Sequence, residues 1–346
     1  MNAMSQRSGI LTAGSWCVDN NKSLPLWPAE DTMSTITALD RQGGGSGSNM
    51  AFDLKRLDPD FFVETMGIVG DDSDGRFLIE KCDQAGVKRD RLAMVKGGMT
   101  AFTDCFNSLE SGKRTHLYFP GVADALSPDD FDFTNTTARL LHLGLPGAHR
   151  TMDGPWGNDT TGWMTVLRAA QQAGLKTNLE MVTTTREKVR HFGRSCLPHL
   201  DLLIVNDFEI GAVADVETRD GTQTIADQVV EALRRIVALG SVSIAAAHFP
   251  EGAIALSRDG NLFCVGSIAI PSNEIAGVNG AGDAFAAGFL YYWHQSHPID
   301  DALRFGHAVA AASMREVSTT AGVTNVRDTQ NLAKQWGYRP APSVKG

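Results

Sequence analysis

The sequence lacks a basic excess, a long apolar run and any close pair of cysteines, and each absence argues against a class of protein. Its 346 residues include 31 Lys and Arg against 40 Asp and Glu, a net charge of −9, whereas a nucleic-acid surface needs clustered cations. No apolar stretch approaches the roughly 18 residues that a membrane helix needs. The five cysteines are odd in number and widely spaced, which argues against a disulfide framework or a zinc site. We therefore expect a cytoplasmic protein that binds neither nucleic acid nor a membrane.

The sequence does contain a regular alternation of short apolar runs with stretches of helical spacing. Hydrophobic residues make up 42% and charged residues 21%, and the length fits one large α/β domain or two small ones. The apolar runs lie at 10–18, 61–69, 139–145, 175–181, 202–205 and 242–247. This alternation predicts a mostly parallel sheet between helices, in a domain of residues 9–330. Residues 1–8 and 339–346 are expected to be loose termini.

Two segments depart from this rhythm. Residues 33–39 and 99–119 alternate polar and apolar side chains, which predicts antiparallel ribbon with one exposed face, and the second carries the turn Ser111-Gly112-Lys113. We expect them to form a small sheet that covers a cleft beside the main sheet, a lid built from about 19–43 and 98–120. Because open strand edges usually need cover, we also expect a homodimer through this lid.

Glycine is abundant, with 35 residues, and one glycine-rich stretch leads into a helical run. The stretch Gly43-Gly44-Gly45-Ser46-Gly47-Ser48-Asn49 has neither the Lys of a P-loop nor the spacing G-x-G-x-x-G. Asn49 can both donate to and accept from a polyhydroxylated ligand. An equally good interpretation is a flexible loop in which Asn49 caps the helix.

A second glycine-rich stretch, Gly277-Val278-Asn279-Gly280-Ala281-Gly282-Asp283, precedes an apolar helix at 284–291. Small residues at a helix start leave backbone N–H groups accessible, and the helix dipole favours an anion there. Asp283 at such a site could accept the proton of an attacking hydroxyl. The alternative is that Asp283 only complements the dipole of its helix.

Two further candidates follow expected strands. Asn206 and Glu209 fit a capping box, and they could also organise hydrated Mg²⁺ and phosphate oxygens, since Mg²⁺ prefers hard oxygen ligands. Asp19, at the end of the first strand, could bond sugar hydroxyls or be an ordinary turn acid. On the lid ribbon, Phe106, His116 and Tyr118 could face a sugar or simply pack.

Taken in order, these elements resemble the ribokinase-like (PfkB) carbohydrate kinase family over about residues 10–326. The segment 44–51 fits G-G-x-G-x-N-x-A, 67–72 resembles G-x-V-G-x-D, 206–209 fits N-x-x-E and 280–283 fits G-A-G-D. The resemblance implies a ribokinase-like α/β fold with a small β lid, and transfer of the γ-phosphoryl group of ATP to a sugar hydroxyl.

The resemblance also implies a role for each matching residue. Asp283 would be the base, and the amides of Gly280, Ala281 and Gly282 would form the anion hole. Asn206 and Glu209 would arrange phosphate and Mg²⁺ through water, Gly252 would lie on the nucleotide side, and Asp19, Gly44, Gly45 and Asn49 would hold the acceptor.

Three departures and two alternatives accompany the resemblance. Gly277 and Val278 stand where the family has Asp and Thr beside a monovalent cation, which leaves dependence on that cation open; the segment 247–252 lacks an early glycine, and Glu180 stands where the family often has Asp. A nucleoside acceptor would need an aromatic slot, which Trp16, Trp27 and Phe106 could supply. A non-catalytic sugar or nucleotide sensor is the other alternative, because fold does not fix function.

Overall fold

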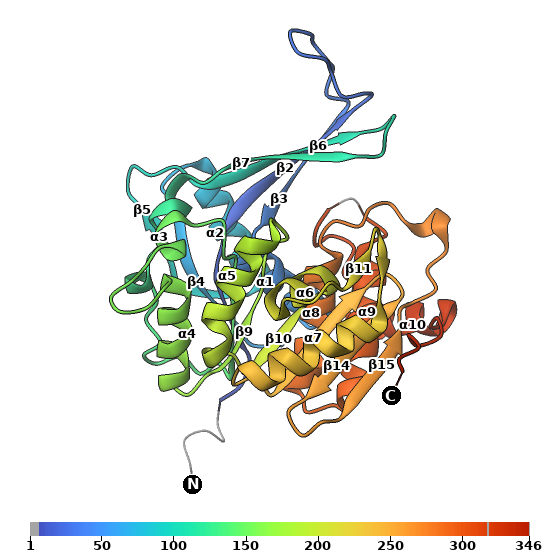
Figure 1. Ribbon diagram of the computed structural model, residues 1–346. Helices are drawn as coiled ribbons and strands as arrows, with labels where there is room; N and C mark the ends of the chain where they lie inside the picture. Colours follow the sequence, from blue (N-terminus) through green and yellow to red (C-terminus); the bar gives the residue numbers. More distant parts are fainter. Residues whose placement is uncertain (1–6, 317, 346) are drawn as a thin grey trace.

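A nine-stranded sheet forms the centre of the computed structural model, which describes residues 7–316 and 318–345 (Figure 1). Its strand order is β15-β14-β13-β10-β9-β8-β1-β4-β5. The strands are β1 (Ile10–Gly14), β4 (Val63–Gly70), β5 (Lys88–Val95), β8 (Leu140–Gly144), β9 (Lys176–Leu179), β10 (Leu202–Asn206), β13 (Ile244–Phe249), β14 (Gly252–Ser257) and β15 (Leu262–Gly266). Pairing is parallel from β13 to β5 and antiparallel only at β14 and β15, so the predicted mostly parallel sheet is confirmed.

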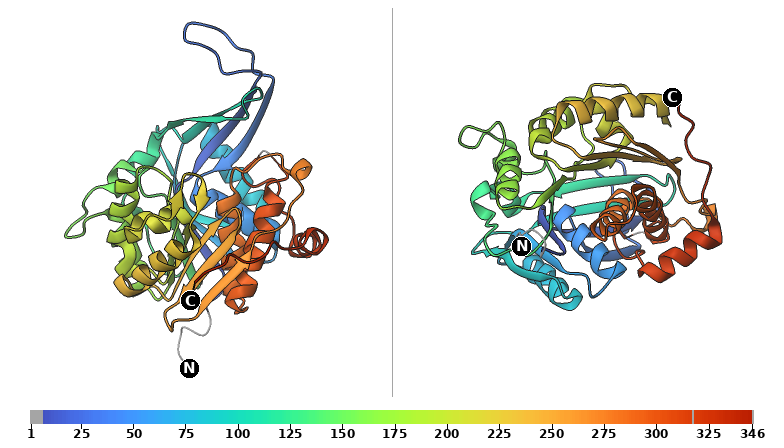
Figure 2. Two further views of the ribbon diagram at one scale, coloured as in Figure 1. Left: turned by 45° about the vertical axis from the view of Figure 1, so that its right-hand side comes forward. Right: turned by 90° about the horizontal axis from the view of Figure 1, so that it is seen from below.

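Helices cover both faces of this sheet (Figure 2). They are α1 (Ser46–Leu57), α2 (Ser73–Ala85), α3 (Arg150–Asp153), α4 (Gly162–Gln172), α5 (Arg186–Cys196), α6 (Asp207–Ala214), α7 (Ala226–Leu239), α8 (Ala281–His294), α9 (Ile299–Ser313) and α10 (Val326–Trp336). Successive residues of β1 enter opposite layers: Ile10 belongs to the hydrophobic cluster that includes residues of α1, α2, α8, α9 and α10, and Leu11 to the one that includes residues of α3 to α7. The inner strands, such as β1 and β8, are apolar without alternation because both of their faces are buried, whereas the edge strand β5 is charged and largely exposed.

A separate four-stranded sheet stands beyond one end of the main sheet, as Figure 1 shows. Its order is β3-β2-β6-β7, with bounds β2 (Cys17–Leu24), β3 (Ala38–Gly44), β6 (Ala101–Ser108) and β7 (Arg114–Phe119). Strands β6 and β7 form the predicted antiparallel ribbon, whereas β2 and β6 are parallel. A further ribbon of two short strands, β11 (Arg219–Asp220) and β12 (Gln223–Thr224), follows α6.

Two predicted boundaries in this region are wrong. The expected first strand at 10–18 is two strands: after the Ser15 N–H donates to the carbonyl oxygen of Gly144, the chain leaves the main sheet, and β2 pairs with β3 and β6 instead. The ribbon expected at 33–39 begins only at Ala38. Its partner β2 ends at Leu24 because Pro25 has no N–H with which to extend the pairing.

The carboxyl-terminal segment of the described residues makes defined contacts with the domain. The segment 339–345, expected to be loose, contains neither helix nor strand but lies against the domain. The Arg339 N–H donates to the carbonyl oxygen of Ser267, and Val344 packs against the core.

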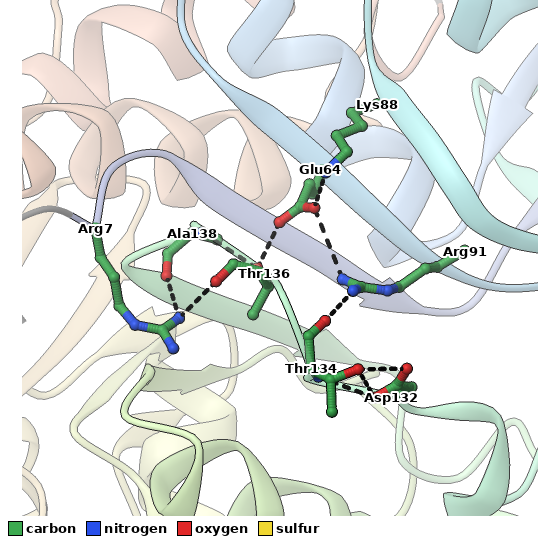
Figure 3. A network of polar contacts seen from close by, with 8 residues as sticks. All are labelled: Arg7, Glu64, Lys88, Arg91, Asp132, Thr134, Thr136 and Ala138. Carbon is green, nitrogen blue, oxygen red and sulfur yellow. Dashed lines mark hydrogen bonds and ion pairs between the residues drawn. The ribbon is translucent and has the colours of Figure 1, made fainter. Parts of the chain in front are cut away.

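A polar network ties the amino ends of β4 and β5 to the segment before β8 (Figure 3). Glu64 is buried, accepts from Thr136 Oγ1, and pairs with Lys88 Nζ at 2.8 Å. Arg7 donates to the carbonyl oxygens of Thr136 at 3.2 Å and Ala138 at 3.0 Å. Without its cationic partners Lys88 and Arg91, the buried Glu64 carboxylate would be left unpaired, so this end of the sheet is structural. No helix of the described residues is both long and apolar enough to span a membrane.

Candidate functional site

A cavity of about 280 Å³ opens at the carboxyl ends of β9 and β10. In an open α/β sheet this is the end at which ligands bind. The cavity brings together six of the predicted site residues, although they come from distant parts of the sequence, and the unassigned Glu180 lies beside them: Gly45, Asn49, Asn206, Glu209, Gly282 and Asp283. Most of the predicted set therefore shares one hollow.

Asp283 lies in the first turn of α8 and is held by Asn49. The Asn49 amide nitrogen donates to Asp283 Oδ2 at 2.7 Å, a contact between residues 234 positions apart. Burial raises the pKa of Asp283 to about 8, and the nearby Glu180 carboxyl contributes in the same direction. A carboxyl group with such a pKa is an effective proton acceptor near neutral pH. The Asp283 carboxyl group also lies within hydrogen-bond reach of the Glu180 carboxyl group.

The start of α8 is shaped by Gly280, whose φ is +75°. A Cβ atom at this position would lie 2.4 Å from the carbonyl oxygen of Thr319, so no larger residue fits without movement. No side chain caps this helix, and its first residues, Ala281 and Gly282, line cavities. The Ala281 N–H makes only a 3.4 Å contact with the carbonyl oxygen of Val278. This helix start is thus suited to an anion.

Glu180 is the site residue to which the sequence interpretation gave no role. It follows β9, and its Oε2 lies 2.7 Å from Nε2 of the fully buried His142. His142 Nδ1 accepts from the Asn178 amide at 3.0 Å, so Nε2 carries the hydrogen and donates it to Glu180. Burial lowers the pKa of His142 to about 4 and raises that of Glu180 to about 8. In the sequence, the only sign of this pair is a histidine on one expected strand and an acid directly after the next.

Asn206 and Glu209 form a capping box and also line the cavity, so both interpretations of this motif describe the same residues. The Glu209 N–H donates to Asn206 Oδ1 at 2.9 Å, and the Asn206 N–H donates to Glu209 Oε2 at 3.2 Å. Thr183 Oγ1 donates to Glu209 Oε1 at 2.7 Å. Burial raises the pKa of Glu209 to about 7.

Asp19, Gly44 and Gly45 lie together where the small sheet meets α1. Asp19 is buried on β2, and a Cβ at Gly44 would lie 2.4 Å from its carboxyl oxygens. Burial raises the pKa of Asp19 to about 6, and Asp283 adds to the effect. Gly45, with φ +84°, occupies the N-cap position of α1. The interpretation of Asn49 as the cap is therefore wrong, because Asn49 lies within the helix and uses its amide on Asp283.

A second cavity of about 410 Å³ adjoins the first and shares Asn206, His248 and Gly282 with it. Its walls are mainly apolar and aromatic, and the His248 ring lies 4.8 Å from that of Phe285. Gly252, expected on the nucleotide side, does not line either cavity. It begins β14, where a Cβ would meet the carbonyl oxygen of Val265 at 2.2 Å.

The chain belongs to the pfkB family of carbohydrate kinases, because the model of that family matches residues 16–325. It is a carbohydrate kinase with a ribokinase-like fold. An ATP-dependent ribose-1-phosphate kinase from Halopiger xanaduensis is 27% identical over 304 residues, 87% of this chain and 90% of that protein. A 5-dehydro-2-deoxygluconokinase from Shouchella clausii is 23% identical over 94% of this chain and 95% of its own. The structure of Arabidopsis thaliana ribokinase complexed with ribose and ATP, 19% identical, superposes with a TM-score of 0.76 over 95% of this chain and 99% of that one.

Proposed function

We propose that this carbohydrate kinase transfers the γ-phosphoryl group of ATP to a hydroxyl of a small sugar, with Asp283 as the general base. One observation carries the proposal: a carboxyl group with a raised pKa and an uncapped helix start face the same cavity. Such a transfer needs a group that accepts the proton of the hydroxyl and donors that stabilise charge on the phosphoryl oxygens. Asp283 supplies the first, and the amides of Gly280, Ala281 and Gly282 supply the second.

The two adjoining cavities support a division between acceptor and nucleotide. The apolar cavity beside His248 and Phe285 suits a planar base, and the polar cavity lies between it and the small sheet. Asp19, Gly44, Gly45 and Asn49 would hold the acceptor sugar, with Asp19 bonding its hydroxyls. The relatives named above support a sugar acceptor and ATP as the donor.

Asn206 and Glu209 fit a magnesium ion that is held through water. Both offer hard oxygen atoms at the cavity wall, but these oxygens already accept hydrogen bonds from within the capping box and from Thr183. Water molecules that bridge to their remaining lone pairs suit Mg²⁺, which sheds its own waters reluctantly. When bound, the ion would neutralise charge on the phosphate oxygens.

The nucleoside alternative loses its proposed aromatic slot. Trp16 is 1% exposed and packs against Phe52, while Trp27 packs against Phe106 with ring centroids 5.7 Å apart. None of these rings lines either cavity. We therefore keep the sugar as the acceptor class. Since the reaction consumes ATP and the five cysteines are unpaired, we assign it to the cytoplasm.

The test is a coupled assay that measures ADP release with a panel of sugars and nucleosides as acceptors. Asp283→Asn keeps the size of the side chain but cannot accept the proton, so kcat should fall by about 10²- to 10⁴-fold. Thermal unfolding of the variant checks that it is folded. Full activity in Asp283→Asn would remove the assigned base. Sugar binding without ADP release by the unaltered protein would favour the sensor.

A further inference from the structure

One face of the small sheet continues outward from the acceptor site in three rows of side chains. Residues paired on adjacent strands share a face, so the pairing of β2 with β6 and of β6 with β7 defines the rows. The first row is Asp19, Thr103 and Tyr118; the second is Asn21, Cys105 and His116; the third is Ser23, Asn107 and Arg114. Cys105 Sγ lies 3.7 Å from His116 Nδ1, which confirms that these side chains meet. Because the first row contains Asp19, the outer rows extend the acceptor site.

The outer rows carry donors that lack acceptors. Asn21 is 7% exposed, and its amide nitrogen has no hydrogen-bond partner among the described residues. Arg114 is half-buried, its pKa is lowered by that burial, and the described part of the chain provides no carboxylate in an ion pair with it. Arg114 and the Cys105 thiol each influence the pKa of the other, which places the guanidinium near the second row. Asp40, at the β3 end of that row, is bonded by Gln42.

The opposite face of the same sheet shows the contrasting arrangement. There Lys22 Nζ pairs with Asp104 at 2.6 Å, and the Asn20 amide donates to the same carboxylate at 3.2 Å. Lys22, on this opposite face, thus has its counter-ion within the sheet, whereas Arg114 does not. A half-buried guanidinium without a partner is costly unless a ligand completes it.

We propose that Arg114, His116 and Asn21 form a subsite for an oxyanion, a phosphate ester or a carboxylate, carried by the acceptor sugar at the end remote from the phosphorylated hydroxyl. The inference rests on the proposed function, because it gives the acceptor of that site its chemical class. Two residues along a strand span about 7 Å, comparable with the length of a small sugar, so the second row, with Asn21 and His116, lies one sugar beyond Asp19. Arg114 begins one row further out, and its long side chain can reach back toward the second row.

The electrostatics of the cavity favour this assignment. Glu180, Glu209 and Asp283 line the cavity, and Asp19 lies close enough for Asp283 to raise its pKa. An anionic acceptor would therefore be repelled unless a cation received its charged end. The planar guanidinium of Arg114 binds carboxylate or phosphate through two parallel hydrogen bonds, and the neutral His116 and Asn21 each offer one more donor. Burial and Arg114 together lower the pKa of His116, which keeps that ring neutral at pH 7.

The experiment compares matched neutral and anionic acceptors in the full-length protein with ATP and Mg²⁺. Ribose against ribose 1-phosphate tests a phosphate ester, and glucitol against gluconate tests a carboxylate. In Arg114→Met, the ratio of kcat/KM for the anionic member to that for the neutral member should fall about 10- to 100-fold, carried by KM. Arg114→Lys keeps the charge without the fork and should recover part of the loss. His116→Ala provides a second variant with a smaller effect.

Lys22→Met is the matched control, because it removes the same charge from the other face of the same sheet. It should leave the ratio unchanged, and an equal fall in Lys22→Met would overturn the subsite in favour of a general charge effect. Calorimetric titration of the same sugars without ATP separates this inference from the proposed function. Binding that needs Arg114 but never leads to ADP release supports the subsite and refutes the kinase reaction. If both neutral and anionic sugars are turned over and Arg114→Met leaves the ratio of their kcat/KM values unchanged, the kinase reaction is supported and the subsite is refuted.

Discussion

Four acidic side chains with raised pKa values surround the proposed point of transfer. Burial raises the pKa of Asp19 to about 6, of Glu209 to about 7, and of Glu180 and Asp283 to about 8. Acids that lie close together in one hollow cannot all ionise at neutral pH, so a proton is retained within the group. The charge state of Asp283 therefore depends on its neighbours, chiefly Glu180.

Glu180→Gln should shift the pH dependence of turnover. A base must be deprotonated, and the Glu180 carboxyl contributes to raising the pKa of Asp283. Glutamine keeps an oxygen to accept from His142 but carries no charge, so the pKa of Asp283 should fall and the acidic limb of log(kcat/KM) should move to lower pH. The measurement is the pH profile of both proteins.

Asp201→Asn serves as the control for that profile, since Asp201 pairs with Lys176 at the opposite end of β9. Its acidic limb should coincide with that of the unaltered protein. If the limb of Glu180→Gln also stays in place, Glu180 does not govern the protonation of Asp283.

Asp53→Asn should stabilise the protein, increasingly so as pH rises. Asp53 is fully buried on α1, both of its carboxyl oxygens lack partners among the described residues, and burial raises its pKa well above the usual value. The folded state thus holds this proton where the unfolded state releases it, so Asp53 lowers the free energy of unfolding as pH rises above about 4. Asparagine removes this dependence. We expect a gain of about 1–2 kcal/mol at pH 8 and little at pH 4, measured by urea unfolding.

The comparison protein for Asp53→Asn is Asp60→Asn, which alters an exposed carboxyl group near the same helix. Its free energy of unfolding should stay close to that of the unaltered protein at both pH values. A pH-independent effect of Asp53→Asn would mean that Asp53 titrates alike in both states.

At the scale of elements, the start of α8 requires glycine at position 280. Gly280→Ala should reduce both stability and activity, because the added methyl group meets the carbonyl oxygen of Thr319 and φ is +75°. Gly260→Ala is the matched control, since φ is +90° there but nothing lies within 4 Å of the added atom. Both variants should lose about 1 kcal/mol to backbone strain, measured by urea unfolding. Only Gly280→Ala should also lose kcat, and unchanged kcat there would separate this turn from transfer.

Some elements of the fold could be predicted from the sequence, and others could not. The six strands from β13 to β4 follow from apolar runs because both of their faces are buried, and α6 follows from the Asn206 capping box. Strands β5, β14 and β15 were not predicted. The break between β1 and β2 could not be predicted, because it depends on a hydrogen bond to Gly144, far along the chain. Glu180 was missed for the same reason: its partners His142 and Asp283 come from β8 and α8, and only folding brings them together.

For the whole molecule, we propose a homodimer through the small sheet. Its edge strands are β3 and β7, and Leu39 and Leu117 on these edges are 68% and 56% exposed. An exposed edge with apolar side chains is a surface that proteins usually cover. Light scattering should therefore give twice the chain mass of 37.2 kDa.

Leu117→Lys should convert this dimer to monomers, because it buries an unpaired charge in the proposed interface. Leu239→Lys, at the end of α7, changes a leucine of similar exposure, 59%, on another surface and should leave the mass unchanged. A dimer that survives Leu117→Lys but not Leu239→Lys would move the interface to α7, and a monomeric unaltered protein would refute the dimer. Since β7 also carries Arg114, a lid dimer would fix the strand that receives the charged end of the acceptor, and Leu117→Lys should then raise KM for anionic sugars as well.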